Sequence, residues 1–192
     1  MVLIRHEQPG DQVAELQRSA FTGHGDQVAE LVGGLHRLID QQHGLSLVAE
    51  LDGMVVGHLM CTPALLDAPR ELVTVEVLSP LGVLPGWQRQ GVGSALVRRA
   101  IELLAERSVP ALFLEGDPAY YGRLGFLAGG PLGYRRPSLR IPPAAFQVIP
   151  LPAHQPWMTG TLVYPPVFWE HDLVGLRGER LAAAISAQAL PE

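Results

Sequence analysis

The chain has 192 residues, 47% of them hydrophobic, and a formal net charge of −5 at pH 7. This length and composition suit one domain with a sizeable hydrophobic core and exclude a disordered or fibrous protein. All 14 basic residues are arginine, and the acidic balance argues against a basic groove, so we expect no nucleic-acid partner.

Two further features bear on the compartment. The single cysteine, Cys61, excludes an internal disulfide, and we interpret it as a small buried hydrophobe in a reducing environment. Charges at Arg5, Glu7 and Asp11 interrupt any apolar segment of the kind that a signal peptide needs. Residues 141–169 carry no charge, but their prolines exclude a membrane-spanning helix. We therefore expect a cytoplasmic protein without a membrane partner.

The N-terminal part of the chain predicts one strand followed by helices. Residues 2–5 have the composition of a short strand, and Gly10-Asp11 opens a segment whose apolar residues recur at helical spacing. A second helical pattern covers residues 26–39. Its Gly33-Gly34 pair costs about 1 kcal/mol per glycine relative to alanine, so we expect either one helix or two short ones.

Three strands are predicted next. Asp52-Gly53, between residues 45–51 and 54–61, is a strong hairpin signal and predicts two antiparallel strands. Residues 73–83 are rich in β-forming side chains but contain Pro80. We therefore predict a strand that bulges or splays there.

The clearest helix covers residues 91–107, where apolar side chains recur every four positions until Pro110 prevents continuation. The alternation predicts an α/β (α+β) fold, a mixed twisted sheet with helices on both faces. We expect a single domain over residues 1–192, with a core of about 1–168 and a C-terminal extension of about 169–192. The remaining predicted elements are strands at 111–115, 146–151 and 161–164, a short helix at 118–124, and an Ala-rich helix at 177–190.

The turn before the long helix carries the first chemical motif, Gln88-Arg89-Gln90-Gly91-Val92-Gly93-Ser94. A helix N-terminus offers unpaired backbone amides and a partial positive charge, and glycines let that backbone approach a bulky anion. The turn therefore predicts a pyrophosphate site. A P-loop is excluded because the chain has no lysine, and a dinucleotide fingerprint would need a third glycine.

A second motif, Tyr121-Gly122-Arg123-Leu124-Gly125-Phe126, follows the next predicted strand. A Gln-x-x-Gly-x-Gly turn at the head of a long helix, followed by Tyr-x-x-x-Gly-Phe, resembles the GNAT superfamily of N-acetyltransferases. The resemblance covers roughly residues 45–130, and the later Val-Tyr-Pro-Pro-x-Phe segment is similar to an uncharacterised bacterial branch.

The resemblance implies acetyl-CoA as co-substrate and assigns roles to matching positions. The backbone at Leu81 and Val83 would pair with the pantetheine arm, and Tyr121 would protonate the departing thiolate. An asparagine often precedes that tyrosine by seven residues, and this chain has Leu114 there. The pyrophosphate would be held by the residues of the turn, namely Gln88, Arg89, Gln90, Gly91, Gly93 and Ser94.

Transfer to an amine also needs a proton acceptor, because a protonated amine cannot attack a thioester. Glu76 and Glu115 are the two carboxylates that the predicted strand layout brings near the acyl group. In a regular strand Glu76 would face away from Leu81 and Val83, so it could serve only if a bulge near Pro80 reversed the register. The choice between the two stays open at this point.

The sequence thus predicts an N-acyltransferase that moves an acyl group from acetyl-CoA to a primary amine of a small molecule or peptide by direct attack. No histidine spacing indicates a metal, and Cys61 has no nearby histidine that would make it a nucleophile. The alternative is a non-catalytic acyl-CoA sensor or interaction module on the same fold. Trp157, Phe168 and Trp169 predict association as a homodimer through residues 157–190.

Overall fold

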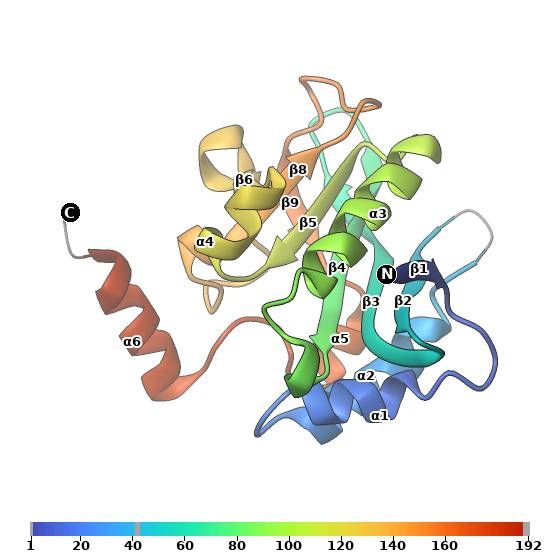
Figure 1. Ribbon diagram of the computed structural model, residues 1–192. Coiled ribbons are helices and arrows are strands. Elements are labelled where there is room, and N and C mark those ends of the chain that lie inside the picture. The colour runs from blue at the N-terminus through green and yellow to red at the C-terminus, as the bar shows by residue number, and fades with distance from the viewer. Residues whose placement is uncertain (1, 41–42, 190–192) are drawn as a thin grey trace.

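A mixed β-sheet with helices packed against it forms the body of the computed structural model, which describes residues 2–40 and 43–189 (Figure 1). The main path of the sheet runs β1-β2-β3-β4-β5-β8-β6, and β9 pairs with β3 and β7. The strands are β1 (Leu3–His6), β2 (Leu45–Leu51), β3 (Met54–Asp67), β4 (Leu72–Val83), β5 (Ala111–Glu115), β6 (Leu127–Ala128), β7 (Tyr134–Arg135), β8 (Phe146–Pro150) and β9 (Gly160–Val163).

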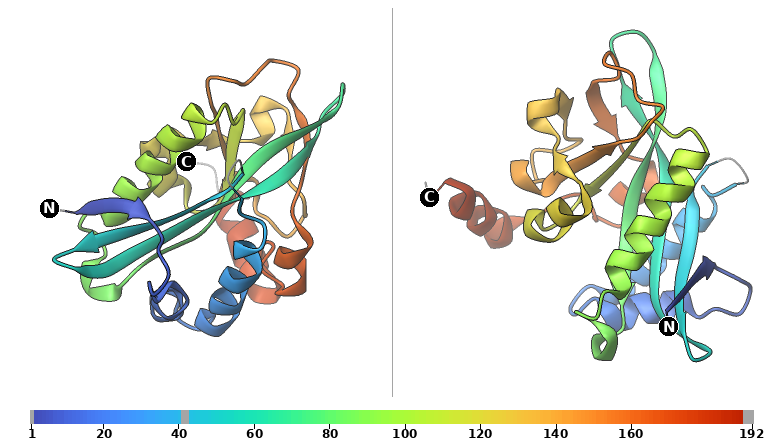
Figure 2. Two further views of the ribbon diagram at one scale, coloured as in Figure 1. Left: turned by 90° about the vertical axis from the view of Figure 1, so that its right-hand side faces the viewer. Right: turned by 45° about the horizontal axis from the view of Figure 1, so that its top comes forward.

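Helices cover both faces of this sheet, as Figure 2 shows. One core lies beneath α3, and the other lies beneath α1, α2 and α5. This arrangement confirms the predicted fold class. Within the described residues, no helix is both long and apolar enough to cross a membrane. The helices are α1 (Val13–Ala20), α2 (Gly25–His36), α3 (Val92–Glu106), α4 (Pro118–Tyr121), α5 (Pro166–Glu170) and α6 (Gly178–Ala189).

Strand β4 is irregular at the predicted place. Leu81 pairs with Leu59 and Leu78 pairs with Cys61, so β4 has one extra residue between these pairs. On its other side β4 runs parallel to β5 and pairs with it at two positions, the later of which joins Val77 to Phe113. The two strands then separate. The predicted bulge and splay are both confirmed.

The C-terminal part of the chain packs differently from the prediction. Phe168 is 1% exposed and belongs to the core beneath α5, and Trp157 packs against the same core beneath the Arg70 guanidinium. The expectation that Phe168 and Trp157 form an exposed apolar surface is therefore wrong, because the two prolines before Phe168 start a helix that turns it inward. Trp169 remains 43% exposed.

Helix α2 continues through its two glycines as one helix, and α5 explains one of them. A Cβ atom on Gly34 would lie 2.4 Å from Cγ2 of Val167, whereas a Cβ atom on Gly33 would meet nothing within 4 Å. Gly34 therefore permits close packing of α5 on α2, and Gly33 has no such role.

The two glycines should consequently respond in opposite ways to alanine. Gly33→Ala should raise the free energy of unfolding by about 0.5–1 kcal/mol, the usual cost of glycine in a helix. Gly34→Ala should lose that gain or destabilise the protein, because the stiff Val167 side chain cannot move aside freely. Urea unfolding of both variants measures the difference. Equal gains for both would contradict the packing argument.

Candidate active site

The turn before α3 presents backbone amides to a pocket. Gly91 adopts a left-handed conformation with φ of 85°, and its carbonyl accepts the first helical hydrogen bond, from Ala95 N–H, at 2.9 Å. The amides of Val92, Gly93 and Ser94 precede this donor and have no acceptor within the helix. The positive end of the helix dipole lies at the same place, so the turn favours an anion.

Glycine is needed at position 93 because another side chain approaches it. A Cβ atom there would lie 2.7 Å from the Tyr120 hydroxyl oxygen, which is 3.4 Å from Ser94 Oγ. Tyr120 thus forms one wall of the space in front of the amides.

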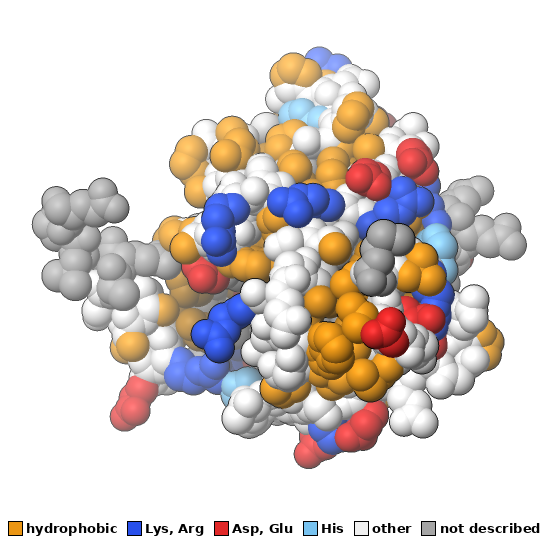
Figure 3. Space-filling model, viewed as in Figure 1, with side chains coloured by type: hydrophobic (Ala, Val, Ile, Leu, Met, Phe, Trp, Pro, Cys, Tyr) orange, Lys and Arg blue, Asp and Glu red, His pale blue; other side chains and the backbone are white. Residues whose placement is uncertain are grey.

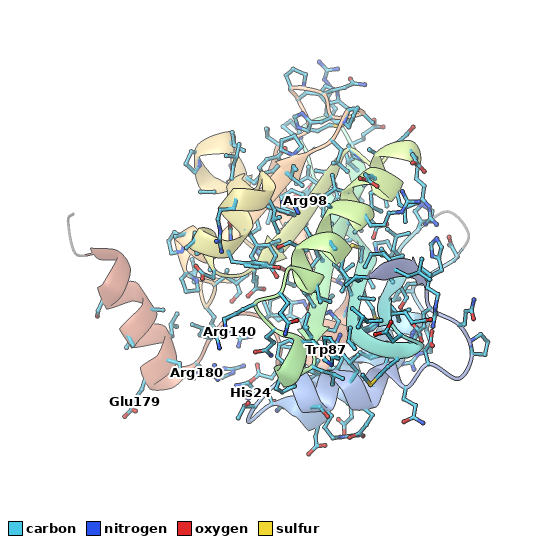
Figure 4. The ribbon with its side chains drawn as sticks, in the orientation of Figure 1. His24, Trp87, Arg98, Arg140, Glu179 and Arg180 are labelled. Carbon is cyan, nitrogen blue, oxygen red and sulfur yellow. The ribbon has the colours of Figure 1, made fainter. Side chains whose placement is uncertain are left out.

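Three arginines surround this space, which we call the turn pocket. Arg89 comes from the turn, Arg98 from α3 one turn beyond Ser94, and Arg123 from the segment after α4. Figure 4 shows Arg98 on α3 and Trp87 where the turn begins, and Figure 3 shows basic side chains on the surface over α3 and α4. No acidic side chain lines the pocket among the described residues. The turn pocket is therefore suited to a ligand with several negative charges.

The two predicted glutamines have other contacts. Gln88 donates from Nε2 to the Val83 carbonyl at 3.0 Å, and Gln90 donates from Nε2 to the Gly86 carbonyl at 3.0 Å. Gln88 lines the turn pocket and Gln90 does not. Both side-chain amides hold the connection between β4 and α3 in shape.

The edge of β4 faces the gap between the separated strands. Leu84 N–H donates to the Val56 carbonyl at 2.9 Å, so by the alternation of an antiparallel ladder the peptide groups of Leu81 and Val83 point away from β3. They point to the side where β5 has separated from β4. An extended chain lying there could hydrogen-bond to them as a further strand would.

A second cavity, the gap pocket, begins where the strands separate and has a volume of about 340 Å³. It adjoins the turn pocket, since Leu81 lines both. Tyr120 lines the turn pocket and Tyr121 lines the gap pocket, and the two rings pack edge to face with their centroids 4.8 Å apart. The apolar wall of the gap pocket includes Phe21, Val28, Leu31, Phe168 and Leu173.

Tyr121 presents a protonated phenol to this pocket. Burial, aided by Tyr120 and Asp117, raises the pKa of its phenol above the ordinary value of 10. The ring packs edge to face on Phe126, the last residue of the Tyr-x-x-x-Gly-Phe motif. The hydroxyl therefore keeps its proton at neutral pH and can donate a hydrogen bond to a negatively charged atom that forms nearby.

Glu115 lies in the same pocket, at the end of β5. Burial raises the pKa of its carboxyl to about 7, although hydrogen bonds with the Tyr164 side chain and from Gly175 N–H, with the nearby Arg140 charge, act in the opposite direction. A carboxyl group with such a pKa exchanges its proton readily at neutral pH. The structure thus brings a protonated phenol, Tyr121, and a carboxyl group that exchanges its proton near neutral pH, Glu115, into one cavity.

Glu76 lies elsewhere. It lines a separate pocket with Arg107, at the C-terminal end of α3, and Gly44 N–H donates to its Oε1 at 2.9 Å. Burial raises its pKa to about 7 as well. The two ends of this 15-residue helix are about 22 Å apart. The bulge near Pro80 is present. Glu76 nevertheless pairs with Leu112, where β4 and β5 are still hydrogen-bonded, so its side chain does not lie in the cavity with Tyr121.

Cys61 and His58 occupy the interior. Cys61 is fully buried as predicted, and burial raises the pKa of its thiol, which disfavours a nucleophilic thiolate. His58 is buried between Gln17 and Ser46, at 2.8 and 2.9 Å, and burial lowers its pKa. In the part of the chain that the structure describes, no group of three or more His, Cys, Asp or Glu residues is placed to hold a metal ion.

Comparisons with known proteins point to one family. The Acetyltransferase (GNAT) family profile matches residues 11–126. The chain is 33% identical over 135 residues to the uncharacterized N-acetyltransferase YjhQ of Escherichia coli K12, over 70% of this chain and 74% of that protein.

Two solved structures are similar over most of their length. YhbS from Escherichia coli, a GNAT family N-acetyltransferase in complex with CoA, matches with a TM-score of 0.75 and 31% identity, over 87% of this chain and 91% of that one. A GNAT family acetyltransferase from Brucella melitensis in complex with acetyl-CoA has a TM-score of 0.68 and 29% identity, over 88% and 98% of the two chains.

The raised pKa of Glu115 predicts a pH-dependent stability difference. A carboxyl whose pKa rises from 4.5 to about 7 on folding favours the folded state at low pH and loses this contribution as the pH rises through 7. Glu115→Gln should therefore be more stable than the parent above pH 7, by up to about 3 kcal/mol, and the difference should vanish below about pH 4.5. Urea unfolding at a series of pH values measures it; a constant difference would contradict the raised pKa.

Proposed function

Because this chain belongs to the acetyltransferase (GNAT) family and is an acyltransferase of that family, we propose that it transfers the acetyl group of acetyl-CoA directly to a primary amine of a small molecule or peptide. The observation that carries the proposal is the junction of two pockets at Leu81, one lined by cations and the other containing Tyr121 and Glu115. The CoA and acetyl-CoA complexes of the two similar structures support the choice of co-substrate.

The turn pocket is proposed to hold the phosphates of the co-substrate. The amides of Gly93 and Ser94 face the pyrophosphate, while Arg89, Arg98 and Arg123 supply positive charge around it. The peptide groups of Leu81 and Val83 would bond to the pantetheine arm along the open edge of β4. This edge leads from the turn pocket to the gap pocket, so the thioester would arrive beside Tyr121.

In the proposed reaction Glu115 first takes a proton from the acceptor's ammonium group, which leaves a neutral amine. The amine nitrogen then bonds to the thioester carbonyl carbon, and an amide N–H near Val83 stabilises the negative charge on the carbonyl oxygen. As the carbon–sulfur bond breaks, Tyr121 gives its proton to the thiolate, and the second proton that the nitrogen loses as the amide forms returns to the Tyr121 oxygen. No residue of the protein becomes acylated.

A non-catalytic acyl-CoA sensor on the same fold is the alternative. A sensor needs the turn pocket but has no need for a proton donor and a proton acceptor in the adjoining cavity, so the pairing of Tyr121 with Glu115 favours catalysis. Release of free thiol from acetyl-CoA in the presence of a panel of primary amines separates the two. The proposal expects amine-dependent release, and tight CoA binding with no release for any amine would favour the sensor.

Other properties of the protein remain predictions. They are a cytoplasmic location and a homodimer, and Trp169, which is 43% exposed, leaves an aromatic side chain at the surface for such a contact. We also retain the proposal of a single domain.

Removal of the Tyr121 hydroxyl should slow the chemical step. General acid catalysis is typically worth about 10²- to 10⁴-fold, so Tyr121→Phe should lower kcat by at least about tenfold while the Kd of CoA changes less than about threefold. Tyr120→Phe should instead alter the KM for acetyl-CoA, because its hydroxyl faces Gly93. Steady-state kinetics of both variants test this, and an unchanged kcat in Tyr121→Phe would exclude the tyrosine acid.

A carboxylate in the turn should prevent co-substrate binding. Gly93→Glu places a negative charge against the proposed pyrophosphate site and a side chain against the Tyr120 hydroxyl. Calorimetric titration should find at least about 100-fold weaker CoA binding. Gly86→Ala is the matched control, since a Cβ atom there would meet nothing within 4 Å. Unchanged affinity in Gly93→Glu would remove the turn from the proposed site.

A further inference from the structure

Residues 171–177, which we call the strap, pack on the body of the protein before α6 begins. Val174 is fully buried, and Leu176 N–H donates to the Arg140 carbonyl at 2.8 Å. Asp172 accepts hydrogen bonds from both Arg140, at 3.0 Å, and Arg177, at 2.6 and 2.7 Å. Helix α6 alone projects from the body (Figure 1). The strap is therefore held in place at several points.

The strap reaches into the gap pocket. Gly175 lines this cavity, and its N–H donates to Glu115 Oε2 at 2.9 Å. Its φ of 66° and its contacts both require glycine, since a Cβ atom would lie 2.5 Å from the carbonyl carbon of Arg140. This close approach brings the amide to the carboxylate from a position 60 residues later in the chain.

A second donor to the same carboxylate comes from another segment. Tyr164, directly after β9, is buried and lines the gap pocket with Glu115, and its hydroxyl lowers the pKa of the Glu115 carboxyl. Burial and the neighbouring Glu115 raise the pKa of its phenol well above 10, so the hydroxyl remains protonated and donates. Neither Tyr164 nor Gly175 belongs to the strand that carries Glu115.

We propose that Tyr164 and the Gly175 amide are positioning groups that hold the Glu115 carboxylate in the gap pocket for proton transfer from the acceptor amine, with the strap as a working part of the active site. The inference rests on the proposed function, in which Glu115 is the base. The hydrogen bond from Gly175 N–H fixes the orientation of the carboxylate, and the neighbouring Tyr164 hydroxyl stabilises its ionised form.

A purely structural role for Tyr164 would lower activity equally at every pH, whereas a positioning role changes the pH profile. Tyr164→Phe removes a donor to the ionised form, so the acid limb of kcat/KM should move upward by about one pH unit. At pH values well above this acid limb, the kcat/KM of the variant should stay within about threefold of that of the parent. The other titratable and charged groups facing Glu115 are Tyr121, His24 and Arg140.

His24 also lines the gap pocket and accepts a hydrogen bond from Arg180 at 2.5 Å, as their adjacent positions in Figure 4 indicate. Because His24 is another side chain of this cavity that can exchange a proton, His24→Gln serves as the assignment control. The acid limb should remain where it is in this variant. A limb that disappears with His24 would overturn the assignment to Glu115.

Gly175 and Gly178 both have positive φ, so alanine substitutions at these two positions form a test and a matched control for the strap. Gly175→Ala forces the amide away from Glu115 by the contact with Arg140, and the acid limb should move upward as in Tyr164→Phe. Gly178, with φ of 55°, has nothing within 4 Å of its Cβ position, so Gly178→Ala adds comparable backbone strain without the contact. The control should keep the parent profile.

The outcomes separate this inference from the proposed function. Full activity in Glu115→Gln would remove the base, and the proposed mechanism with it. Loss of activity in Glu115→Gln, together with an unmoved acid limb in both Tyr164→Phe and Gly175→Ala, would overturn the positioning role alone. Upward shifts in these two variants, with no shift in Gly178→Ala, would support it.

Discussion

Strand β4 stays bonded to β3 up to its end but separates from β5 after Val77, and the rest of the site depends on this separation. Buried backbone groups normally find partners, so an open strand edge inside a fold is a cost that the protein must offset. Gln88 donates to the Val83 carbonyl, and an extended ligand could bond to Val83 N–H and to the peptide group of Leu81. The separation also leaves room between the strands for a cavity, and Glu115 and Tyr121 line it.

Charge is distributed locally rather than over the whole surface. The protein carries a net charge of −5, yet three arginines and a helix N-terminus meet at the turn pocket. In the neighbouring cavity a single carboxylate sits against apolar and aromatic walls, where burial brings its pKa to about 7. Under the proposed function, an anionic co-substrate and a cationic amine would thus each meet opposite charge, without a field that extends over the whole molecule.

The parts of the site that depend on local sequence could be predicted. The glycine-rich turn, the long helix and the Tyr-x-x-x-Gly-Phe motif each have signals within a few residues, and the family resemblance built on them is confirmed. Arg98 was missed, although its position four residues after Ser94 places it on the same face of α3. Pro80 correctly marked the irregular strand.

What could not be predicted depends on contacts between distant segments. Glu76 and Glu115 are equivalent by composition, and only the pairing of β4 with β5 reveals that one lies in the closed part of the sheet and the other at its open end. Tyr164 and Gly175 lie 49 and 60 residues after Glu115 in the chain. The fold of β9 and the strap brings them to it, and no short sequence pattern predicts that contact. The close packing of Val167 against Gly34 of α2 likewise joins distant segments.

Direct transfer requires acetyl-CoA and the amine to occupy the two adjoining pockets at the same time. Two-substrate initial-rate kinetics tests this most directly, because it shows whether both substrates bind before a product leaves. Initial rates of thiol release should be measured while both substrates are varied. Formation of a ternary complex predicts double-reciprocal lines that intersect. Parallel lines, the signature of a covalent acyl-enzyme that forms before the amine binds, would contradict the account.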